Sequence, residues 1–164
     1  MSHLCSAPRA ITPQQLLSEQ VRRILAAPVY DLAIETPLQE AAGLSDRLGN
    51  RVLLKREDLQ PTFSFKIRGA YTRLSRLTTC QRQAGVVTAS AGNHAQGVAM
   101  AAAHLGMTAT IVMPSTTPSL KVQGVRARGG RVVLHGDSFP HALAHALKLA
   151  DLEGATFVPP FDDP

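Results

Sequence analysis

The residues of this chain best suited to covalent amine chemistry are its lysines, Lys55, Lys66, Lys121 and Lys148. Lys148 falls beside the polar side of an amphipathic helical pattern, Lys121 in a basic, glycine-containing helical stretch, and Lys55 in the charged run KRED. Lys66 alone has apolar neighbours on both sides, in SFKIRGAY, where a loop leads into a helix. A lysine in such a place either extends its amine past an apolar stem to water or uses it chemically.

An amine must lose its proton before it can act as a nucleophile or base, and desolvation or a nearby positive charge favours that loss. Phe63, Phe65 and Ile67 could supply the desolvation around Lys66, and Arg68 the positive charge. The sequence around Lys66 is equally consistent with a surface lysine at a helix start, so these neighbours leave both interpretations open.

A second stretch, SAGNHAQG at 90–97, follows the apolar run GVVTA and opens a helical pattern. Backbone N–H groups at the start of a helix converge with the helix dipole and form an anion site. Gly92 permits a tight backbone there, and the side chains of Ser90 and Asn93 add hydrogen-bonding groups. The alternative is a helix start at which Ser90 or Asn93 serves only as the cap.

The histidines and cysteines give weaker indications. His94, in the same loop, is either a general base or a residue that packs at the helix start. His141 and His145 are spaced to face one metal ion, but no third ligand or HExxH glutamate accompanies them, so we expect no metal site. Cys5 and Cys80 are far apart and read as ordinary thiols.

From residue 51 onward, short apolar runs alternate with longer helical patterns, which predicts a parallel sheet in a three-layer αβα fold. The predicted strands are 51–55, 85–90, 108–114 and 131–136, with 155–160 as a possible fifth, and the predicted helices are 66–77, 94–106, 119–130 and 138–154. Ligands of such sheets bind at the carboxyl ends of the strands. Both SFK and SAGNH are expected there.

The first fifty residues differ from this pattern. Residues 12–28 show helical spacing, with Thr12 as the expected cap and Pro13 in the first helical position. A short extended piece and a second helix are expected to follow. We expect this segment to pack elsewhere than on the sheet.

Composition excludes several classes of protein. The 164 residues are 45% hydrophobic, enough for one good core, and contain no apolar run that could span a membrane and no signal-peptide pattern, so we expect a cytoplasmic protein. A net charge of +5 would suit nucleic acid, but the arginines are dispersed and aromatic residues make up only 4%. We therefore expect a small-molecule ligand, with no nucleic acid or membrane as partner.

Two longer stretches, KREDLQPTFSFKIRGA and TASAGNHAQGVA, together resemble the lysine motif and the asparagine loop of the fold type II pyridoxal-phosphate enzymes, and specifically the threonine dehydratases. The similarity continues from APVYDLAIETPLQ through IVMPSTTPSLKV and RVVLHG to FVPPFDDP. LAAPVY and VPPFDDP are closer to the biosynthetic branch of that family than to its catabolic members or to serine racemases.

The resemblance implies a role for each residue of the two motifs. Lys66 would bond pyridoxal 5'-phosphate covalently, Phe65 would pack beside its ring and Asn93 would hydrogen-bond its 3-hydroxyl group. The substrate carboxylate would be held by Ser90, Ala91, Gly92, Asn93 and His94. The implied reaction converts L-threonine to 2-oxobutanoate and ammonia, the first step of isoleucine biosynthesis.

The resemblance also implies that this chain is the amino-terminal portion of a longer, homo-oligomeric enzyme. Residues 1–50 would belong to a large cofactor domain, 51–155 would form the small αβα domain and 156–164 would return to the large one. A chain of this extent is expected to bind the cofactor poorly and turn over little alone. The alternatives are a non-catalytic fragment or interaction module, or a related serine/threonine dehydratase or racemase.

Overall fold

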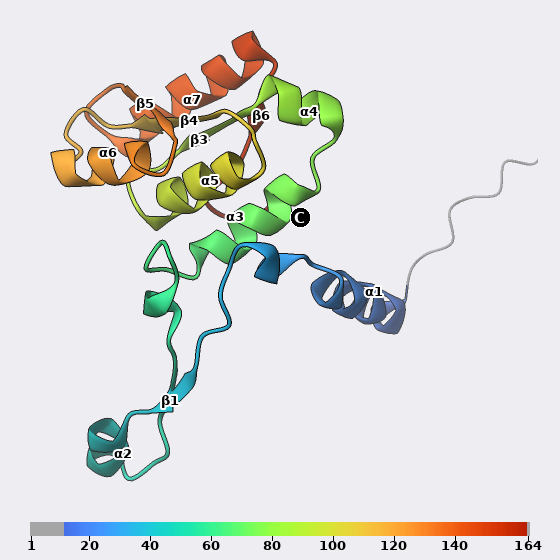
Figure 1. The fold of residues 1–164 in the computed structure, drawn as a ribbon, viewed down its shortest axis with the longest axis vertical. Coiled ribbons are helices and arrows are strands. Elements are labelled where there is room, and N and C mark those ends of the chain that lie inside the picture. Colours follow the sequence, from blue (N-terminus) through green and yellow to red (C-terminus); the bar gives the residue numbers. More distant parts are fainter. Residues whose placement is uncertain (1–11, 164) are drawn as a thin grey trace, which may run out of the picture.

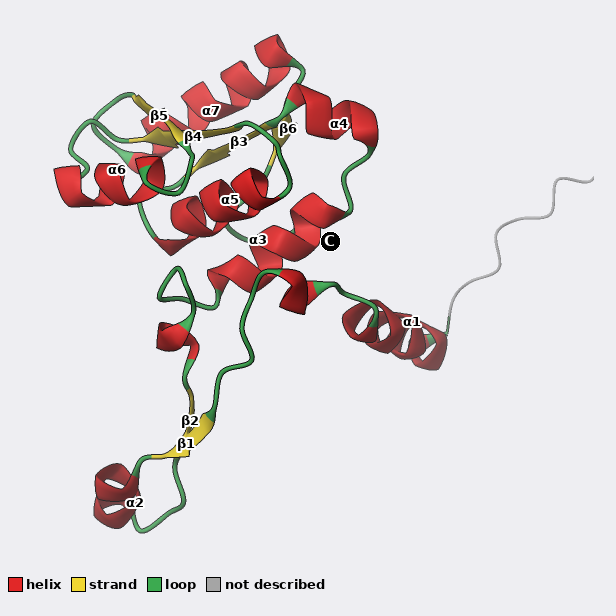
Figure 2. Cartoon of the chain, in the orientation of Figure 1, coloured by secondary structure: helices red, strands yellow, loops and turns green. Residues whose placement is uncertain are grey.

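The computed structural model describes residues 12–163 of the chain. Its centre is a four-stranded parallel sheet in the order β5-β4-β3-β6 (Figures 1 and 2). The strands are β3 (Val86–Ala89), β4 (Ala109–Met113), β5 (Arg131–Leu134) and β6 (Thr156–Phe157). One face is covered by α7 (Phe139–Glu153), and the other by α3 (Lys66–Ser75), α5 (Asn93–His104) and α6 (Ser119–Arg126). The predicted three-layer αβα arrangement is confirmed.

The two central strands, β3 and β4, are apolar enough to be buried between helices on both faces. Every residue of β3 and β4 is buried, as expected for parallel strands covered by helices on both faces. Alternate residues face opposite layers. Val86 and Ile111 join the core beneath α3 and α5, whereas Val87 and Val112 pack with alanines of α7.

Close packing of α3 on α5 fixes where the lysine motif lies. A β-carbon on Gly97, in α5, would come 3.2 Å from the carbonyl carbon and oxygen of Lys66 and 3.3 Å from the nitrogen of Ile67. Only a glycine leaves room for this approach without displacement. The first turn of α3 therefore rests against the first turns of α5.

The strand predicted at 51–55 forms, but not in the predicted sheet. β2 (Leu53–Lys55) pairs antiparallel with β1 (Leu38–Glu40), and the two enclose α2 (Ala42–Leu48) in a hairpin that extends away from the sheet (Figure 1). All six strand residues are exposed, so no burial pattern distinguishes the two faces. The expectation that residues 51–55 open the parallel sheet was wrong, because an apolar run alone does not specify its pairing partner.

At the amino-terminal end, the predicted helix is confirmed as α1 (Pro13–Leu25). The side chain of Thr12 accepts a hydrogen bond from the nitrogen of Gln15, whose own side chain bonds back to Thr12 in a capping box. α1 buries none of its residues. Cys5 lies outside the described residues.

Three short elements complete the fold. Two are single 3-10 turns, η1 (Val29–Asp31) and η2 (Glu57–Leu59), and the third is the six-residue helix α4 (Thr79–Ala84), which was not predicted. None of the helices within residues 12–163 is both long enough and apolar enough to cross a lipid bilayer.

Candidate active site

A cavity of about 670 Å³ opens where α3 and α5 begin. Its walls come from α3 along its whole length, the first turn of α5, the segment that follows β6, and α1. Four of the residues singled out from the sequence line it, namely Phe65, Lys66, Arg68 and His94. The cavity thus joins the lysine motif to the end of the asparagine loop.

The amine of Lys66 is ordered within this cavity. Its Nζ donates a hydrogen bond to the carbonyl oxygen of Pro160 at 2.9 Å. The same atom lies 5.2 Å from the ring centroid of Phe161 and 5.6 Å from that of Phe65, close enough for cation–π attraction. Within residues 12–163, Lys66 makes no ion pair with a carboxylate.

In the loop that leads to Lys66, the polar side chains are buried and the aromatic side chains are exposed. Gln60, Thr62 and Ser64 are buried, whereas Phe63 and Phe65 are 73% and 60% exposed. Phe63 also has a positive φ of 54°, which is costly for an aromatic residue. Large apolar side chains exposed beside an ordered amine indicate a surface that contacts a ligand or another protein segment.

This burial corrects part of the expectation for Lys66. Ile67 points into the core and is fully buried, and Phe63 faces solvent. Arg68 does not offer its charge to Lys66, because it is bound to Glu57. The rings that lie near the amine are those of Phe65 and, unexpectedly, Phe161.

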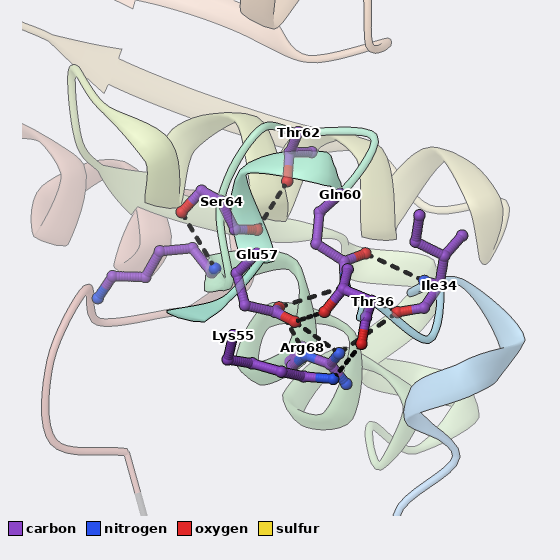
Figure 3. A network of polar contacts seen from close by, with 9 residues as sticks. Ile34, Thr36, Lys55, Glu57, Gln60, Thr62, Ser64 and Arg68 are labelled. Carbon is purple, nitrogen blue, oxygen red and sulfur yellow. Dashed lines mark hydrogen bonds and ion pairs between the residues drawn. The ribbon is translucent and has the colours of Figure 1, made fainter. Parts of the chain in front are cut away.

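A polar network beside the loop holds the start of α3 (Figure 3). Arg68 donates to Glu57 in a two-pronged pair, Nε to Oε2 at 2.7 Å and Nη2 to Oε1 at 2.8 Å. Thr36 Oγ1 donates to Glu57 Oε1 at 2.6 Å, and Gln60 Nε2 donates to Glu57 Oε2 at 3.2 Å. The hydrogen bonds from Arg68 are the largest cause that lowers the pKa of Glu57 to about 2.

Gln60 ties a further segment into this network. Its buried amide makes both hydrogen bonds of a backbone-like pair with Ile34, accepting from the nitrogen at 3.0 Å and donating to the oxygen at 2.8 Å. Lys55 Nζ donates to the carbonyl oxygen of Thr36 (Figure 3). Residues 34–36 and 55–60 are therefore joined to the first turn of α3.

The asparagine loop leaves β3 and turns into α5. Ser90 is buried, its nitrogen donates to the carbonyl oxygen of Val112 at 3.1 Å, and its Oγ accepts from the nitrogen of Gly92 at 3.2 Å. Gly92 occupies the cap position and Asn93 is the exposed first residue of the helix. Neither Ser90 nor Asn93 acts as the side-chain cap, so the alternative interpretation of this loop was wrong.

His94 lies inside, in the first turn of α5. Its side chain faces the segment after β6, where Nε2 lies 3.3 Å from the carbonyl oxygen of Val158, and the residue is only 8% exposed. Burial, and to a smaller extent the charge of Lys66, lowers the pKa of His94, although the bond to Val158 opposes this. A neutral ring that donates from Nε2 keeps a lone pair on Nδ1.

The segment 158–163 was not expected to form a wall of the site. Val158 and Pro160 supply the two carbonyl oxygens that bond His94 and Lys66, and Asp163 pairs with Arg73 of α3 at 2.7 Å. The order of the strands in the sheet explains why this segment reaches the site. Because β6 lies beside β3, the residues after each strand leave the sheet at the same edge.

The other histidines make local contacts. His141 Nδ1 lies 2.8 Å from Oδ1 of Asp137, and the ring of His145 stacks on that of His135 with centroids 3.9 Å apart. The pair that was considered as metal ligands is thus divided between two different partners. Within the described residues, no group of three or more His, Cys, Asp or Glu side chains could hold a metal ion.

A family model described as "Pyridoxal-phosphate dependent enzyme" matches residues 29–164. The chain belongs to this family. The match begins at the residue that opens η1 and takes in the lysine motif, the asparagine loop and the wall formed by 158–163. The parallel αβα fold is likewise that of the fold type II members among its structural neighbours.

Relatives in this pyridoxal-phosphate family are named threonine dehydratases. The chain is 57% identical over 148 residues to a threonine dehydratase of Nicotiana attenuata and 54% identical over 147 residues to the biosynthetic L-threonine dehydratase IlvA of Escherichia coli (strain K12). Each alignment covers 90% of this chain but only 25% and 29% of the relative. The chain therefore spans little more than a quarter of the length of these proteins.

Two solved structures in the family illustrate the shared fold. The processed form of threonine deaminase isoform 2 from Solanum lycopersicum superimposes with a TM-score of 0.88 at 54% identity, covering 93% of this chain and 44% of that one. Maize serine racemase gives 0.83 at 30% identity, covering 88% and 44%. The fold is therefore common to members with different names.

The residues present fit the reactive part of the family's cofactor. Pyridoxal 5'-phosphate has an aldehyde that an amine can bond and a flat pyridine ring that packs on apolar side chains. Lys66 presents its amine in the cavity without a carboxylate partner among the described residues, and the ring centroids of Phe65 and Phe161 lie 5.6 Å and 5.2 Å from that amine. Ser90, Ala91, Gly92 and Asn93 precede His94 directly but are not lining residues of this cavity.

Proposed function

We propose that this protein is the amino-terminal part of a threonine dehydratase, which converts L-threonine to 2-oxobutanoate and ammonia with pyridoxal 5'-phosphate. The observation that carries the proposal is the ordered amine of Lys66 in a cavity shared with His94, in a chain more than half identical to named threonine dehydratases. The proposed site residues are those expected from the motifs, Phe65, Lys66, Ser90, Ala91, Gly92, Asn93 and His94.

In this proposal Lys66 has two tasks. Its Nζ would hold the cofactor, and as a free, neutral amine it would take the proton from the α-carbon of threonine. When bound, pyridoxal 5'-phosphate supplies an electron-withdrawing ring that accepts the electrons left by that proton. The hydrogen bond to Pro160 places Nζ beside the segment after β6, which supports a role for this amine inside the cavity.

The remaining residues of the site would bind and orient. The rings of Phe65 and Phe161, near the amine, would pack beside the flat ring of the cofactor. The amino end of α5, which follows Gly92, offers backbone N–H groups and a helix dipole to the substrate carboxylate. A neutral His94 adds no positive charge of its own to this binding.

An activity assay tests the proposal. Because the chain spans about a quarter of its relatives, we would measure 2-oxobutanoate release in two forms: the chain alone, and a chimera in which it replaces the matching segment of the Escherichia coli relative. The chimera should act on L-threonine, and Lys66→Ala should lower its rate by about a hundredfold or more. Retained activity in the alanine variant would refute the role of Lys66.

Substrate choice is part of the same test. Threonine and serine differ by one methyl group, which a pocket distinguishes by about 1–3 kcal/mol. Serine racemase is among the structural neighbours, so the chimera should also be offered L-serine and assayed for pyruvate and D-serine. D-serine as the main product would favour the racemase alternative.

A non-catalytic fragment that pairs with a longer chain is the second candidate. It is favoured by exposed apolar residues in the amino-terminal segment, such as Leu17, Ile24 and Leu25 of α1. In either case we propose the division anticipated from the sequence, with 1–50 and 156–164 belonging to a large domain and 51–155 to the small one. Co-purification with a full-length relative, in the absence of activity, would favour this candidate.

The cellular setting is also part of the proposal. We propose that the full-length enzyme is a homo-oligomer that acts in the cytoplasm at the first step of isoleucine biosynthesis; relatives that are named biosynthetic support a biosynthetic role. Feeding labelled threonine to cells that depend on this gene, and following the label into isoleucine, would test the pathway assignment.

A further inference from the structure

We propose that Glu57 is a positioning residue for Lys66, acting through Arg68. The inference rests on the proposed function of Lys66 as the amine that bonds the cofactor. Glu57 does not itself line the cavity, but it bonds to Arg68, which does. It would act by fixing the backbone from which the amine extends.

The first step of the argument is the geometry of the pair. Arg68 stands two residues after Lys66, in the first turn of α3, and both prongs of its guanidinium bond to Glu57. Two parallel charge-assisted hydrogen bonds restrain orientation as well as distance. The Glu57 side chain is 16% exposed and that of Arg68 24%, so water screens the pair less than it would a surface pair.

The second step is that the carboxylate is itself held. Thr36 and Gln60 donate to the same two oxygens, and Gln60 is anchored to the backbone of Ile34 by two hydrogen bonds (Figure 3). Arg68 Nη2 also lies 3.3 Å from the oxygen of Ile34. Glu57 therefore connects α3 to a fixed frame rather than to a mobile side chain.

The third step is that α3 is also restrained by α5 and by the loop before it. Gly97 of α5 lies against the backbone of Lys66 and Ile67, and the nitrogen of Lys66 donates to Ser64 Oγ at 3.3 Å. The loop between the two anchors contains the strained residue Phe63. Loss of the Glu57 anchor would let this loop relax and carry Lys66 with it.

Two readouts in the 164-residue chain test the proposal. The first is the acetylation rate of Lys66 by acetic anhydride, relative to the exposed Lys148, measured by peptide mass spectrometry well below the unfolding temperature. The second is the concentration of pyridoxal 5'-phosphate that half-saturates Lys66, found by borohydride trapping. The ratio of the Lys66 and Lys148 acetylation rates is measured without cofactor, and neither readout depends on catalysis.

Glu57→Gln keeps the size of the side chain and removes its charge. We expect Lys66 acetylation to rise about threefold or more relative to Lys148, and half-saturation to need about threefold more cofactor, because fewer molecules hold the amine in place. Arg68→Lys keeps the charge without the fork and should shift both readouts in the same direction, which covers the case in which Glu57→Gln fails to fold.

Asp58→Asn is the matched control. Asp58 follows Glu57 directly and forms a two-pronged pair with Arg56, but that pair is exposed and does not touch α3. It should leave both readouts at wild-type values. Wild-type readouts in folded Glu57→Gln and Arg68→Lys would overturn the positioning role. Failure of the wild-type chimera with the Escherichia coli relative to trap cofactor on Lys66 would instead refute the proposed function, while the acetylation ratio would still decide the role of Glu57.

Discussion

At the scale of single residues, the site combines an ordered amine with a buried imidazole. Lys66 and His94 come from different helices, and each bonds a carbonyl oxygen of the segment after β6. Because Pro160 and Val158 offer only acceptors, neither contact requires a charged partner. Both side chains are therefore held in place without an ion pair among the described residues.

The buried state of His94 predicts a pH dependence of stability. Burial lowers the pKa of His94 below its ordinary 6.5, so the unfolded chain binds a proton more readily than the folded one. The contribution of the neutral His94 ring to the free energy of unfolding is therefore present above pH 6.5. It is lost as the pH falls from 6.5 toward the lower pKa of His94 in the folded chain. Urea unfolding between pH 7.5 and 5 should show a steeper loss for the wild type than for His94→Gln. Parallel curves would contradict a buried neutral imidazole.

At the scale of elements, the start of α3 is fixed by two others, the η2 turn through Glu57 and α5 through Gly97. The two contacts differ in kind. One is a charge-assisted pair that depends on ionisation, and the other is steric. Each yields its own prediction.

Low pH should weaken the pair between Glu57 and Arg68. The folded pKa of Glu57 is about 2, below its usual value near 4.5, so its stabilisation is complete above pH 4.5 and is lost as the pH falls toward 2. The difference in unfolding free energy between the wild type and Glu57→Gln should therefore narrow over that range, measured by urea unfolding at several pH values. A constant difference would show that the ionised pair contributes nothing.

A larger side chain at position 97 should weaken the steric contact between α5 and α3. Alanine favours a helix over glycine by about 0.5–1 kcal/mol, but a methyl group on Gly97 would press on the pinned backbone of Lys66, and overpacking costs about 1–3 kcal/mol. We expect Gly97→Ala to lower the free energy of unfolding by about 1 kcal/mol. Gly69→Ala, in α3 with nothing within 4 Å, should raise it by about 0.5–1 kcal/mol. Equal stabilisation by both would show that α3 moves aside freely.

At the scale of the whole molecule, burial is concentrated in the αβα layers. The core residues lie on the sheet, α3, α5, α6 and α7, whereas α1, α2, β1 and β2 bury none of theirs. Figure 1 shows the hairpin with α2 extending away from the layers. The family match likewise begins after α1, at residue 29.

A truncation tests this uneven distribution. A chain that begins at Val29 loses α1 but no buried residue, so its unfolding free energy should change by less than about 1 kcal/mol. It should also bind less of an apolar dye, because Leu17, Ile24 and Leu25 are removed. Thermal unfolding and dye fluorescence measure the two effects. A large loss of stability would show that α1 is part of the core.

The sequence predicted the layered part of the fold because β3 and β4 are continuous apolar runs between well-marked turns. It did not predict the β1–β2 pairing, since neither strand has a buried face. α4 could have been found from its capping box, in which Thr78 bonds Gln81.

For the site, the sequence indicated Lys66 and His94 from local patterns, but not the contact of Lys66 with Pro160. Those two residues are 94 positions apart, and their contact depends on β6 lying beside β3. Local patterns carry no strand order. Glu57 was interpreted only as part of a surface charge cluster, because no sequence pattern near it predicts that Arg68 is its partner.

The central claim, that Lys66 is the amine that bonds the cofactor, is tested most directly by locating a trapped adduct. The chain would be incubated with pyridoxal 5'-phosphate at increasing concentrations, reduced with borohydride, digested and mapped by mass spectrometry. We predict that the pyridoxyl group appears first on Lys66, before the exposed Lys55, Lys121 and Lys148. Labelling of the exposed lysines at the same or lower concentrations than Lys66 would contradict the claim.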